Sequence, residues 1–297
     1  MISKQKVYGL IGYPVKHSFS AAMHNAAFSH LGINALYTLF EIKPDDLEAF
    51  LLERTDLAGF NITIPHKVYA KKILETKFKG SNPGADQYSE LVGAINTVGR
   101  IDDGKVWWAN TDAPGFVKSL KMDLGFAKTK NKDALVLGCG GAGRAVIAGL
   151  SSEDNGLVRD IYVSEINKDN VTAVKKQFEC FSKVTDKLKF IQKEEIAEKI
   201  KDCSLLVNTT PIGMKDDNIS LIDKELLHNN LMVYDVVYNR ETKLIKDAKA
   251  QGLKAIGGLG MLLYQGVLGF NYWAGKDIAP VDIMRQALEG ELEKCRI

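Results

Sequence analysis

The chain has 297 residues, of which 45% are hydrophobic and 26% are charged, and its formal net charge is +2. This composition is typical of a folded globular protein and argues against a disordered or fibrous chain. The 39 basic and 37 acidic residues are spread along the whole sequence, so no charged surface for nucleic acid or membrane is indicated. The length favours two domains of ordinary size.

The cysteines are widely and irregularly spaced, and no C-x-x-C pair occurs among Cys139, Cys180, Cys203 and Cys295. We therefore expect reduced thiols and no metal site. The N-terminus has too short an apolar run for a secretory signal, and no stretch reaches ~18 apolar residues. These features predict a cytoplasmic protein.

The first hundred residues alternate between strand-like and helix-like patterns. Strands are expected at 6–12, at 35–42 and from Gly59 to a stop at Pro65, and helices at 21–31 and 44–54. This alternation predicts βαβ units and a mostly parallel sheet. Two further strands, within 92–101 and 105–111, are expected to form an antiparallel hairpin through the turn signal Asp102-Asp103-Gly104.

A second α/β register begins near residue 113. Expected here are a helix at 113–125, a strand–helix unit at 134–150, strands at 160–165, 204–210 and 231–238, and a helix, turn and short strand within 248–258. Two amphipathic helices end the sequence and are assigned back to the first domain. The sequence thus predicts an α/β protein with one domain at 1–112 and 259–297, and a Rossmann-type, doubly wound domain at 113–258.

A G-x-G-x-x-G pattern, formed by Gly138, Gly140 and Gly143, follows the apolar strand ALVL and precedes the helical run AVIAGL. In this context glycines permit a tight turn and let backbone N–H groups approach a pyrophosphate at a helix N-terminus. The pattern predicts a dinucleotide site. The alternative is a glycine turn that only packs a helix against a strand.

The end of the next strand bears on which dinucleotide binds. An acid there bonds the ribose 2′-hydroxyl of NAD, whereas a cation accommodates the 2′-phosphate of NADP. Glu165 stands at this position, about 20 residues after the last glycine. Its carboxylate would repel a 2′-phosphate, so the residues favour NAD. Lys168 could nevertheless reach a phosphate, and Glu165 could be a solvated loop acid.

The strand that begins at Gly59 alternates in polarity, so Phe60, Ile62 and Ile64 are predicted to face packing while Asn61 and Thr63 line a cleft. Ligands of open α/β sheets bind beyond the carboxyl ends of the strands, where Lys67 follows this one. The other strand ends of this domain carry further polar residues, which are Ser18, Ser20, Asn96, Thr111 and Asp112. Together these groups suit a small polyhydroxylated ligand.

Each of these residues also has a purely structural interpretation. Ser20 could be the N-cap of the helix at 21–31, and Asp112 the cap of the helix that begins at Ala113. Lys67 could be a solvated lysine. Their joint position at one sheet edge favours the functional interpretation.

Seven ordered blocks resemble the shikimate dehydrogenase family, which includes shikimate and quinate dehydrogenases. They are GYPVKHSFS at 12–20, NITIPHK at 61–67, GAINT at 93–97, NTD at 110–112, GCGGAGR at 138–144, NTTPIGM at 208–214 and GLGMLLYQ at 258–265. The resemblance covers nearly the whole chain. It implies that the first domain binds substrate, the second binds the dinucleotide, and the protein is a monomer or a homodimer.

The resemblance also implies roles for individual residues. It makes Lys67 and Asp112 the catalytic pair. The substrate would contact Ser18, Ser20, Thr63, Asn96 and Gln265, with Tyr238 nearby. The cofactor would contact Gly138, Gly140, Gly141, Ala142, Gly143, Arg144, Glu165, Asn208, Thr209 and Gly258.

The sequence departs from the family pattern at two places. The Asn-Arg-Thr/Ser run that grips the 2′-phosphate of NADP aligns with Ser164-Glu165-Ile166, which puts the usual NADP preference in doubt. The proline that commonly follows the second substrate serine is Ala21. The Ser-x-Ser pair resembles that of the members that use shikimate, and quinate stays open.

The function implied is the reversible reduction of 3-dehydroshikimate to shikimate with NAD or NADP. Lys67 would stabilise negative charge on the substrate oxygen and give a proton, while Asp112 would orient the ammonium; which of the two is the formal base stays open. The alternatives are a dehydrogenase for quinate or an amino-hydroxybenzoate, and a ligand-sensing module of the same fold without turnover.

Overall fold

The computed structural model describes residues 4–78, 86–100, 105–126, 132–152, 157–216 and 218–295. The chain divides into two compact units, one formed by residues 1–111 and 263–294 and the other by 112–262 and 295–297. The chain therefore enters the second unit after Thr111 and leaves it inside a helix, whereas the predicted return lies at 259, where that helix begins.

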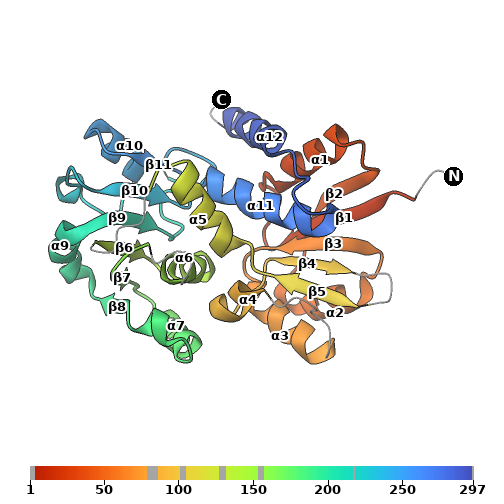
Figure 1. Cartoon of the computed structure of the whole chain (residues 1–297), viewed down its shortest axis with the longest axis horizontal. Helices are drawn as coiled ribbons and strands as arrows, with labels where there is room; N and C mark the ends of the chain where they lie inside the picture. Colours follow the sequence, from red (N-terminus) through yellow and green to blue (C-terminus); the bar gives the residue numbers. More distant parts are fainter. Residues whose placement is uncertain are drawn as a thin grey trace. The chain divides into compact units, whose positions relative to one another are not determined.

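The first unit contains a five-stranded sheet in the order β2-β1-β3-β4-β5 (Figure 1). Its strands are β1 (Lys6–Gly12), β2 (Ala35–Glu41), β3 (Leu57–Ile62), β4 (Thr97–Arg100) and β5 (Val106–Ala109). The strands β1, β2 and β3 are parallel, and β4 and β5 form the antiparallel pair that the sequence predicts. The predicted turn of this hairpin lies outside the described residues.

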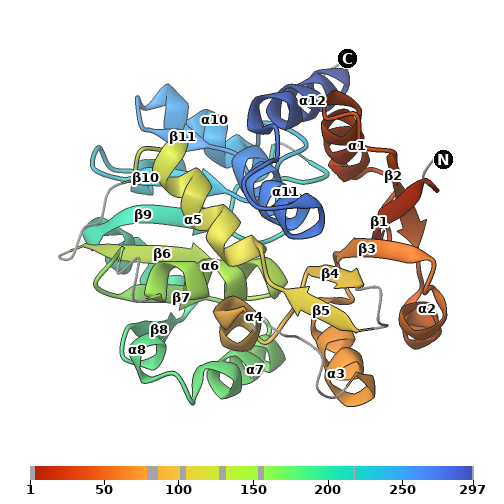
Figure 2. The same cartoon turned by 45° about the vertical axis from the view of Figure 1, so that its right-hand side comes forward.

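Helices lie on both faces of the first sheet, with α2 and α3 on one side and α1, α11 and α12 on the other (Figure 2). They are α1 (Ser20–His30), α2 (Leu47–Glu53) after the 3₁₀ turn Pro44–Asp46, α3 (Lys67–Lys77), α11 (Leu259–Ala274) and α12 (Val281–Lys294), and the short α4 (Gln87–Val92) precedes β4. One core cluster joins Phe50 of α2 and Leu74 of α3 to Phe60 of β3. On the other face, Trp273 donates a hydrogen bond to the carbonyl oxygen of Val98 at 2.9 Å.

A close approach explains one glycine of this sheet. A side-chain carbon at Gly59 would meet Trp273 Nε1 at 2.5 Å and the Val98 carbonyl oxygen at 2.8 Å. Glycine at this position therefore lets the indole of α11 lie directly on β3.

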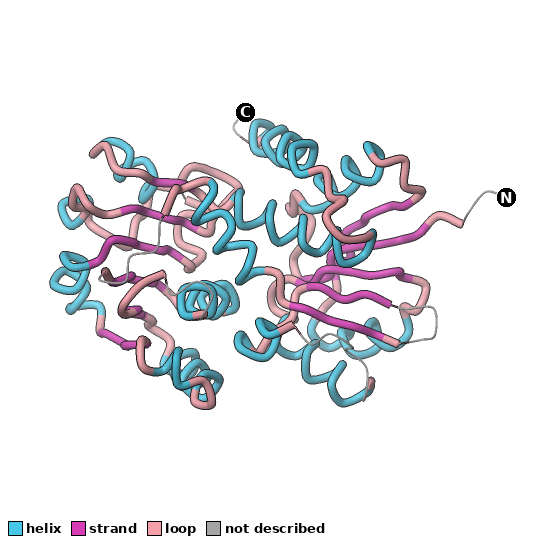
Figure 3. Tube along the Cα trace, viewed as in Figure 1, coloured by secondary structure: helices cyan, strands magenta, loops and turns pink. Residues whose placement is uncertain are grey.

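The second unit contains a six-stranded, wholly parallel sheet in the order β11-β10-β9-β6-β7-β8 (Figure 3). Its strands are β6 (Asp133–Leu137), β7 (Ile161–Ser164), β8 (Leu188–Ile191), β9 (Cys203–Asn208), β10 (Met232–Asp235) and β11 (Ala255–Ile256). This is the strand order of a dinucleotide-binding fold with two βαβαβ halves. The prediction of a doubly wound second domain is confirmed.

The first helix of the second unit precedes its first strand, and the others lie between its strands along the chain. The helices are α5 (Asp112–Met122), α6 (Gly141–Ser151), α7 (Lys168–Phe178), α8 (Ser182–Thr185), α9 (Ile196–Lys199) and α10 (Lys243–Ala250), with 3₁₀ turns at Lys193–Glu195, Ile200–Asp202 and Lys224–Leu226. The helix α5 packs on α6. A buried cluster joins Leu206 of β9 to Ile196 of α9 and Leu244 of α10, so this face of the sheet carries its own apolar core.

Among the described residues, no helix has the length and apolar character needed to cross a membrane. The four cysteines are free thiols, with Cys139 and Cys203 buried and Cys180 and Cys295 exposed. No cluster of three or more potential metal-ligating side chains occurs in the described part of the chain.

Candidate active site

In the first unit, the segments that follow β1 and β3 lie side by side. Ile11 of β1 pairs with Ile62 of β3, so the two parallel strands end at one edge of the sheet. The N–H of Thr63 donates to the Ile11 carbonyl at 2.9 Å, and the N–H of Tyr13 donates to the Ile64 carbonyl at 3.0 Å. The strand therefore ends at Ile62, earlier than the predicted stop at Pro65, and Thr63 stands at the sheet edge.

Two predictions about this strand are wrong. Ile64 is 70% exposed and does not face the core, because it lies beyond the last paired residue. Asn61 is buried and does not line a cleft. Its Oδ1 accepts a hydrogen bond from the Tyr37 hydroxyl at 2.8 Å, and its Nδ2 donates to the Asn96 carbonyl at 3.1 Å. Asn61 thus supports the neighbouring segment.

The two predicted substrate serines lie at the start of α1. Ser20 is the first residue of the helix, and Phe19 occupies the N-cap position, so the alternative that Ser20 is a helix cap is wrong. The Ser18 hydroxyl accepts a hydrogen bond from the Ser20 N–H at 3.2 Å and donates to the Ser20 hydroxyl at 3.2 Å. The structure therefore brings the two hydroxyls together.

Lys67 is held at the start of α3, one turn after Thr63. The N–H of His66 donates to the Thr63 carbonyl at 3.0 Å, and the His66 imidazole is buried with Nε2 2.7 Å from the Ile42 carbonyl. The Lys67 carbonyl accepts a hydrogen bond from the Ile95 N–H at 3.1 Å. A cation at a helix N-terminus is unfavourable for the helix dipole, so helix stability alone does not explain a lysine here.

Asn96, Thr111 and Gln265 form a buried hydrogen-bonded group in the same unit. Asn96 Nδ2 donates to Thr111 Oγ1 at 2.9 Å and to Gln265 Oε1 at 3.3 Å, and Asn96 Oδ1 accepts from the Thr111 N–H at 2.8 Å. Gln265 lies in α11, far along the chain from Asn96. The structure thus bonds two predicted substrate residues, Asn96 and Gln265, directly to each other, and Thr111 bonds to Asn96. The sequence predicts Thr111 only as a polar residue at a strand end.

Asp112 follows Thr111 directly and is the first residue of α5, where it is buried. The chain places it at the carboxyl end of β5, as the sequence predicts. The predicted helix start at Ala113 is therefore one residue late.

In the second unit, the glycine loop links β6 to α6 with the geometry that a dinucleotide requires. Gly138 has a positive φ of 87°, and a side-chain carbon at Gly143 would meet the Gly138 carbonyl oxygen at 2.6 Å. By contrast, such a carbon at Gly140 or Gly141 would meet no atom within 4 Å. The loop therefore packs closely between Gly138 and Gly143, while its backbone at Gly140 and Gly141 is open. This arrangement fits a pyrophosphate at the N-terminus of α6.

Glu165 holds the glycine loop from the end of β7. Its carboxylate accepts hydrogen bonds from the N–H groups of Cys139 at 2.9 Å and Asn167 at 2.8 Å, and from Asn170 Nδ2 at 3.2 Å. Partial burial acts to raise the pKa of Glu165, but these hydrogen bonds outweigh it and leave the pKa below its ordinary value. Glu165 is therefore ionised at neutral pH, and the alternative of a solvated loop acid is wrong.

Burial shifts the pKa of two residues of the loop region. Burial, together with the Glu165 carboxylate, raises the pKa of the Cys139 thiol to about 12. This thiol is therefore neutral and not a nucleophile. Burial also lowers the pKa of the Arg144 guanidinium; Ala142 and Arg144 both lie in the first turn of α6.

Asn208 and Thr209, at the end of β9, bond to protein groups. Thr209 Oγ1 donates within 2.8 Å of the Leu137 carbonyl and 3.0 Å of the Gly138 carbonyl, so it fixes the glycine loop. Asn208 Nδ2 donates to Asp235 Oδ1 at 3.0 Å. Thr209 therefore supports the glycine loop, and Asn208 joins the ends of β9 and β10.

Gly258 and Tyr238 follow β10. The Gly258 N–H donates to the Val237 carbonyl at 2.9 Å, and a side-chain carbon at Gly258 would collide with the Val236 carbonyl oxygen. Glycine at this position therefore brings the chain that leads into α11 close to the segment that carries Tyr238.

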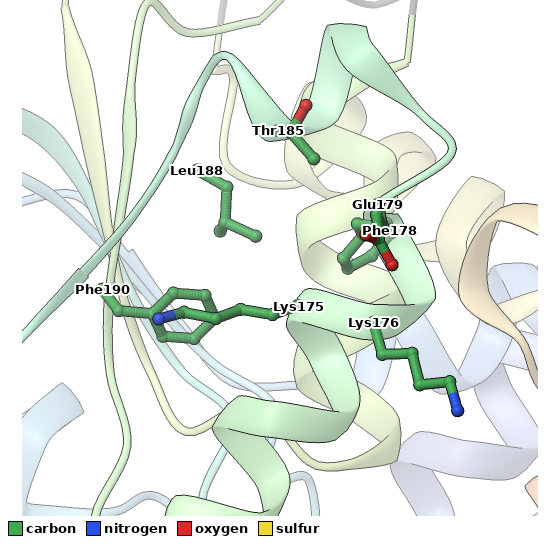
Figure 4. Close-up of a pocket in the computed structure, with 7 residues that line it drawn as sticks. All are labelled: Lys175, Lys176, Phe178, Glu179, Thr185, Leu188 and Phe190. Atoms are coloured by element: carbon green, nitrogen blue, oxygen red, sulfur yellow. The ribbon is translucent and has the colours of Figure 1, made fainter.

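A cavity of about 470 Å³ also occurs in the second unit. It is lined by Lys175, Lys176, Phe178, Glu179, Thr185, Leu188 and Phe190 (Figure 4). The side chain of Lys175 extends over the Phe190 ring, with Nζ 5.2 Å from the ring centroid. None of the predicted site residues lines this cavity.

Comparison with known proteins identifies the family. Residues 10–98 match the shikimate dehydrogenase substrate-binding domain, and residues 258–289 match the shikimate 5′-dehydrogenase C-terminal domain. The chain is 36% identical to a shikimate dehydrogenase (NADP⁺) of Methanopyrus kandleri, over 96% of each chain.

Solved structures agree. A shikimate dehydrogenase in complex with NADP⁺ is 33% identical and matches with a TM-score of 0.83, over 97% of this chain and 96% of that one. A quinate dehydrogenase from Corynebacterium glutamicum in complex with NAD is 26% identical with a TM-score of 0.82, over 96% and 99% of the two chains. Since the relative that is 36% identical and the structure that is 33% identical both match over nearly the whole length, this chain belongs to the shikimate dehydrogenase family.

Proposed function

We propose that the chain catalyses the reversible reduction of 3-dehydroshikimate to shikimate with a nicotinamide dinucleotide. The observation that carries this proposal is the buried group of Asn96, Thr111 and Gln265 at the strand ends of the first unit. Its amide and hydroxyl groups bond to one another, and they are of the kind that binds a polyhydroxylated ring, in a chain of the shikimate dehydrogenase family. The first unit is proposed to bind substrate and the second to bind the dinucleotide.

Lys67 and Asp112 are proposed to handle the proton. When bound, the nicotinamide supplies the hydride or accepts it. Reduction places negative charge on the substrate oxygen, which the Lys67 ammonium stabilises and protonates. Asp112 orients this ammonium. The hydroxyls of Ser18 and Ser20 bind the substrate carboxylate or hydroxyls, and Thr63 and Tyr238 complete the substrate contacts.

A substrate panel tests the proposal. We expect the purified chain to reduce the dinucleotide with shikimate and to do so with a higher kcat/KM than with quinate or an amino-hydroxybenzoate. Formation of the reduced nicotinamide, followed by its absorbance, is the measurement. Quinate is the second candidate because of the similarity to a quinate dehydrogenase. Binding of shikimate without turnover would instead indicate a ligand-sensing module.

The cofactor is proposed to be NAD in preference to NADP, although the matched curated relatives are named for NADP⁺. The ionised Glu165 stands at the end of β7, where the ribose of a dinucleotide binds in this fold. A 2′-phosphate there would meet a negative charge at close range. We therefore expect kcat/KM with NAD to exceed that with NADP.

Substitution of Glu165 separates this charge effect from others. Glu165→Gln keeps an acceptor oxygen for the glycine loop and removes the charge, so we expect the ratio of kcat/KM for NADP over NAD to rise by roughly 10-fold, which corresponds to about 1.4 kcal/mol. Asp169→Asn is the matched control, because Asp169 is an exposed acid in the first turn of α7. A strong NADP preference in the unmodified protein would show that Glu165 does not meet the ribose. The homodimer and the cytoplasmic location stay predictions.

A further inference from the structure

The short helix α4 carries a carboxylate at its N-cap and another within its length. Asp86 is the N-cap residue, and Glu90 lies in the helix itself. After the helix, Gly93 adopts a left-handed conformation with a φ of 67° and turns the chain toward Ala94 and the predicted substrate residue Asn96. The residues 86–96 therefore form one compact segment that leads to the candidate site.

Asp86 does more than cap the helix. Its Oδ1 accepts a hydrogen bond from the Tyr88 N–H at 3.1 Å, and its Oδ2 accepts from the Ser89 N–H at 3.1 Å. The same Oδ2 accepts the Asn110 N–H at 2.6 Å. The Asn110 side chain in turn donates from Nδ2 to the Ala94 carbonyl at 3.0 Å. Two hydrogen bonds thus fix Asn110 to residues 86–96, from opposite ends of the segment.

Asn110 is the last residue before Thr111 and Asp112, at the end of β5. A hydrogen bond that fixes the Asn110 N–H also fixes the direction in which the chain continues. The Asp86 carboxylate, from a different element, thus holds the chain two residues before Asp112.

The helix α3 is tied to the same segment. Lys71 lies one turn after Lys67 on α3, and its Nζ is 3.2 Å from Glu90 Oε1 and also contacts Glu75. The Lys71 side chain is 11% exposed, so the Lys71 end of its ion pair with Glu90 is shielded from water. In addition, the Lys67 carbonyl accepts the Ile95 N–H at 3.1 Å. The segment 86–96 therefore contacts α3, which carries Lys67, and Asn110, which lies two residues before Asp112.

We propose that residues 86–96 act as a brace that sets the positions of Lys67 and Asp112, with Asp86 and Glu90 as positioning residues. This inference rests on the proposed function. Asp86 acts on the Asp112 side through Asn110, and Glu90 acts on the Lys67 side through Lys71. Because Glu90 is half-exposed, water screens its ion pair, and its contribution is the smaller of the two.

Substitution of Asp86 by serine or by asparagine tests its role in the brace separately from its role as the N-cap of α4. Both are good N-cap residues, so Asp86→Ser and Asp86→Asn keep the cap of α4. Neither has the two carboxylate oxygens that accept the three N–H groups at once. Because a displacement of ~1 Å in a reacting group costs about 100-fold in rate, we expect kcat for shikimate to fall by about 10- to 100-fold. KM for shikimate and the thermal midpoint are expected to change much less.

Hydrogen exchange provides a readout that does not depend on turnover. In both Asp86 variants, the amides in a peptide that spans residues 107–116 are expected to exchange faster than in the unmodified protein, because the Asn110 N–H has lost its acceptor. Glu90→Gln is expected to lower kcat by less than the Asp86 variants. Glu48→Gln is the control, since it breaks a 2.9 Å ion pair to Lys77 at the opposite end of α3 and should leave kcat unchanged.

The outcomes are distinct. Unchanged kcat and unchanged exchange in both Asp86 variants would overturn the brace, as would a loss of kcat in Glu48→Gln equal to that in Glu90→Gln. If the unmodified protein does not oxidise shikimate, the proposed function is wrong, and faster exchange at 107–116 still shows whether Asp86 fixes this strand end.

Discussion

Replacement of Lys67 by alanine is expected to lower kcat for shikimate oxidation by at least ~100-fold, with only a modest change in KM. This is the low end of what a positioned acid or base contributes to a reaction. Lys67 begins α3, where its backbone carbonyl is bonded to the Ile95 N–H and its ammonium opposes the helix dipole. In the proposed role, the Lys67 ammonium acts mainly when charge develops on the substrate oxygen, which affects kcat. It contributes less to the binding of substrate, so KM changes little. Steady-state kinetics with shikimate and the preferred dinucleotide measure the effect.

Lys72→Ala is the matched control for this substitution. Lys72 lies on the same helix with its side chain exposed. Lys72→Ala therefore changes the net charge and the composition of α3 by the same amount as Lys67→Ala. Its kcat is expected to stay near that of the unmodified protein. A normal kcat in Lys67→Ala would contradict the proposed catalytic role. An equal decrease in kcat in both variants would indicate that the substitutions damage the helix.

Acidification is expected to destabilise the first unit through His24. This residue is fully buried in α1 and stacks on Tyr37, with ring centroids 4.4 Å apart. Neither ring nitrogen has a hydrogen-bond partner among the described residues. Burial lowers the pKa of His24 to about 3 from an ordinary value of 6.5. The stabilisation from the neutral ring is therefore complete above pH 6.5 and is lost as the pH falls toward about 3.

The expected loss can be measured by urea unfolding at several pH values. Between about pH 7 and about pH 5, the His24 contribution predicts a decrease of about 2 kcal/mol in the free energy of unfolding. His24→Phe keeps an aromatic ring against Tyr37 and removes the titrating group. Between the same two pH values, the free energy of unfolding of this variant should therefore decrease by about 2 kcal/mol less than that of the unmodified protein. His30→Gln changes an exposed histidine of the same helix and should keep the original dependence. The same pH dependence in His24→Phe and in the unmodified protein would contradict the prediction.

The sequence predicts those parts of the fold that are set by local pattern. Gly138, Gly140 and Gly143 stand between a fully apolar strand and a helix, and the spacing of the pattern is itself the geometry of the loop. The structure places them as expected. In contrast, the helix α3 was not predicted, because Pro65 indicates the end of a strand and does not reveal that a helix begins two residues later. The strand β8 was not predicted either, since its four residues lie at the edge of the sheet in a lysine-rich region.

The error at Asn61 has a different cause. Alternation of polar and apolar residues indicates one buried and one open face only when a single face of the sheet is covered. Here helices cover both faces, so the polar side chain of β3 is buried and bonds to Tyr37 and Asn96. Periodicity contains no signal for this second layer, because α11 comes from the opposite end of the chain.

The candidate site shows the same limit. Strand ends could be recognised as polar, which identifies Asn96 and Asp112 as candidates. The bond between Asp86 and Asn110 joins residues 24 positions apart, and no motif relates them. Such non-local contacts depend on the completed sheet, and only the structure reveals which carboxylate fixes which strand end.

The two units differ in the order of their synthesis, because the second, apart from residues 295–297, is one continuous stretch and the first is not. All strands of the second sheet have been made once residue 256 is added. At that stage the strand β3 still lacks the indole of Trp273 that lies on Gly59, and α1 lacks its packing partner α12. Domains fold as units while the chain emerges from the ribosome. The nascent chain therefore acquires a complete parallel sheet for the cofactor while the sheet for the substrate, begun first, still lacks α11 and α12 on one face.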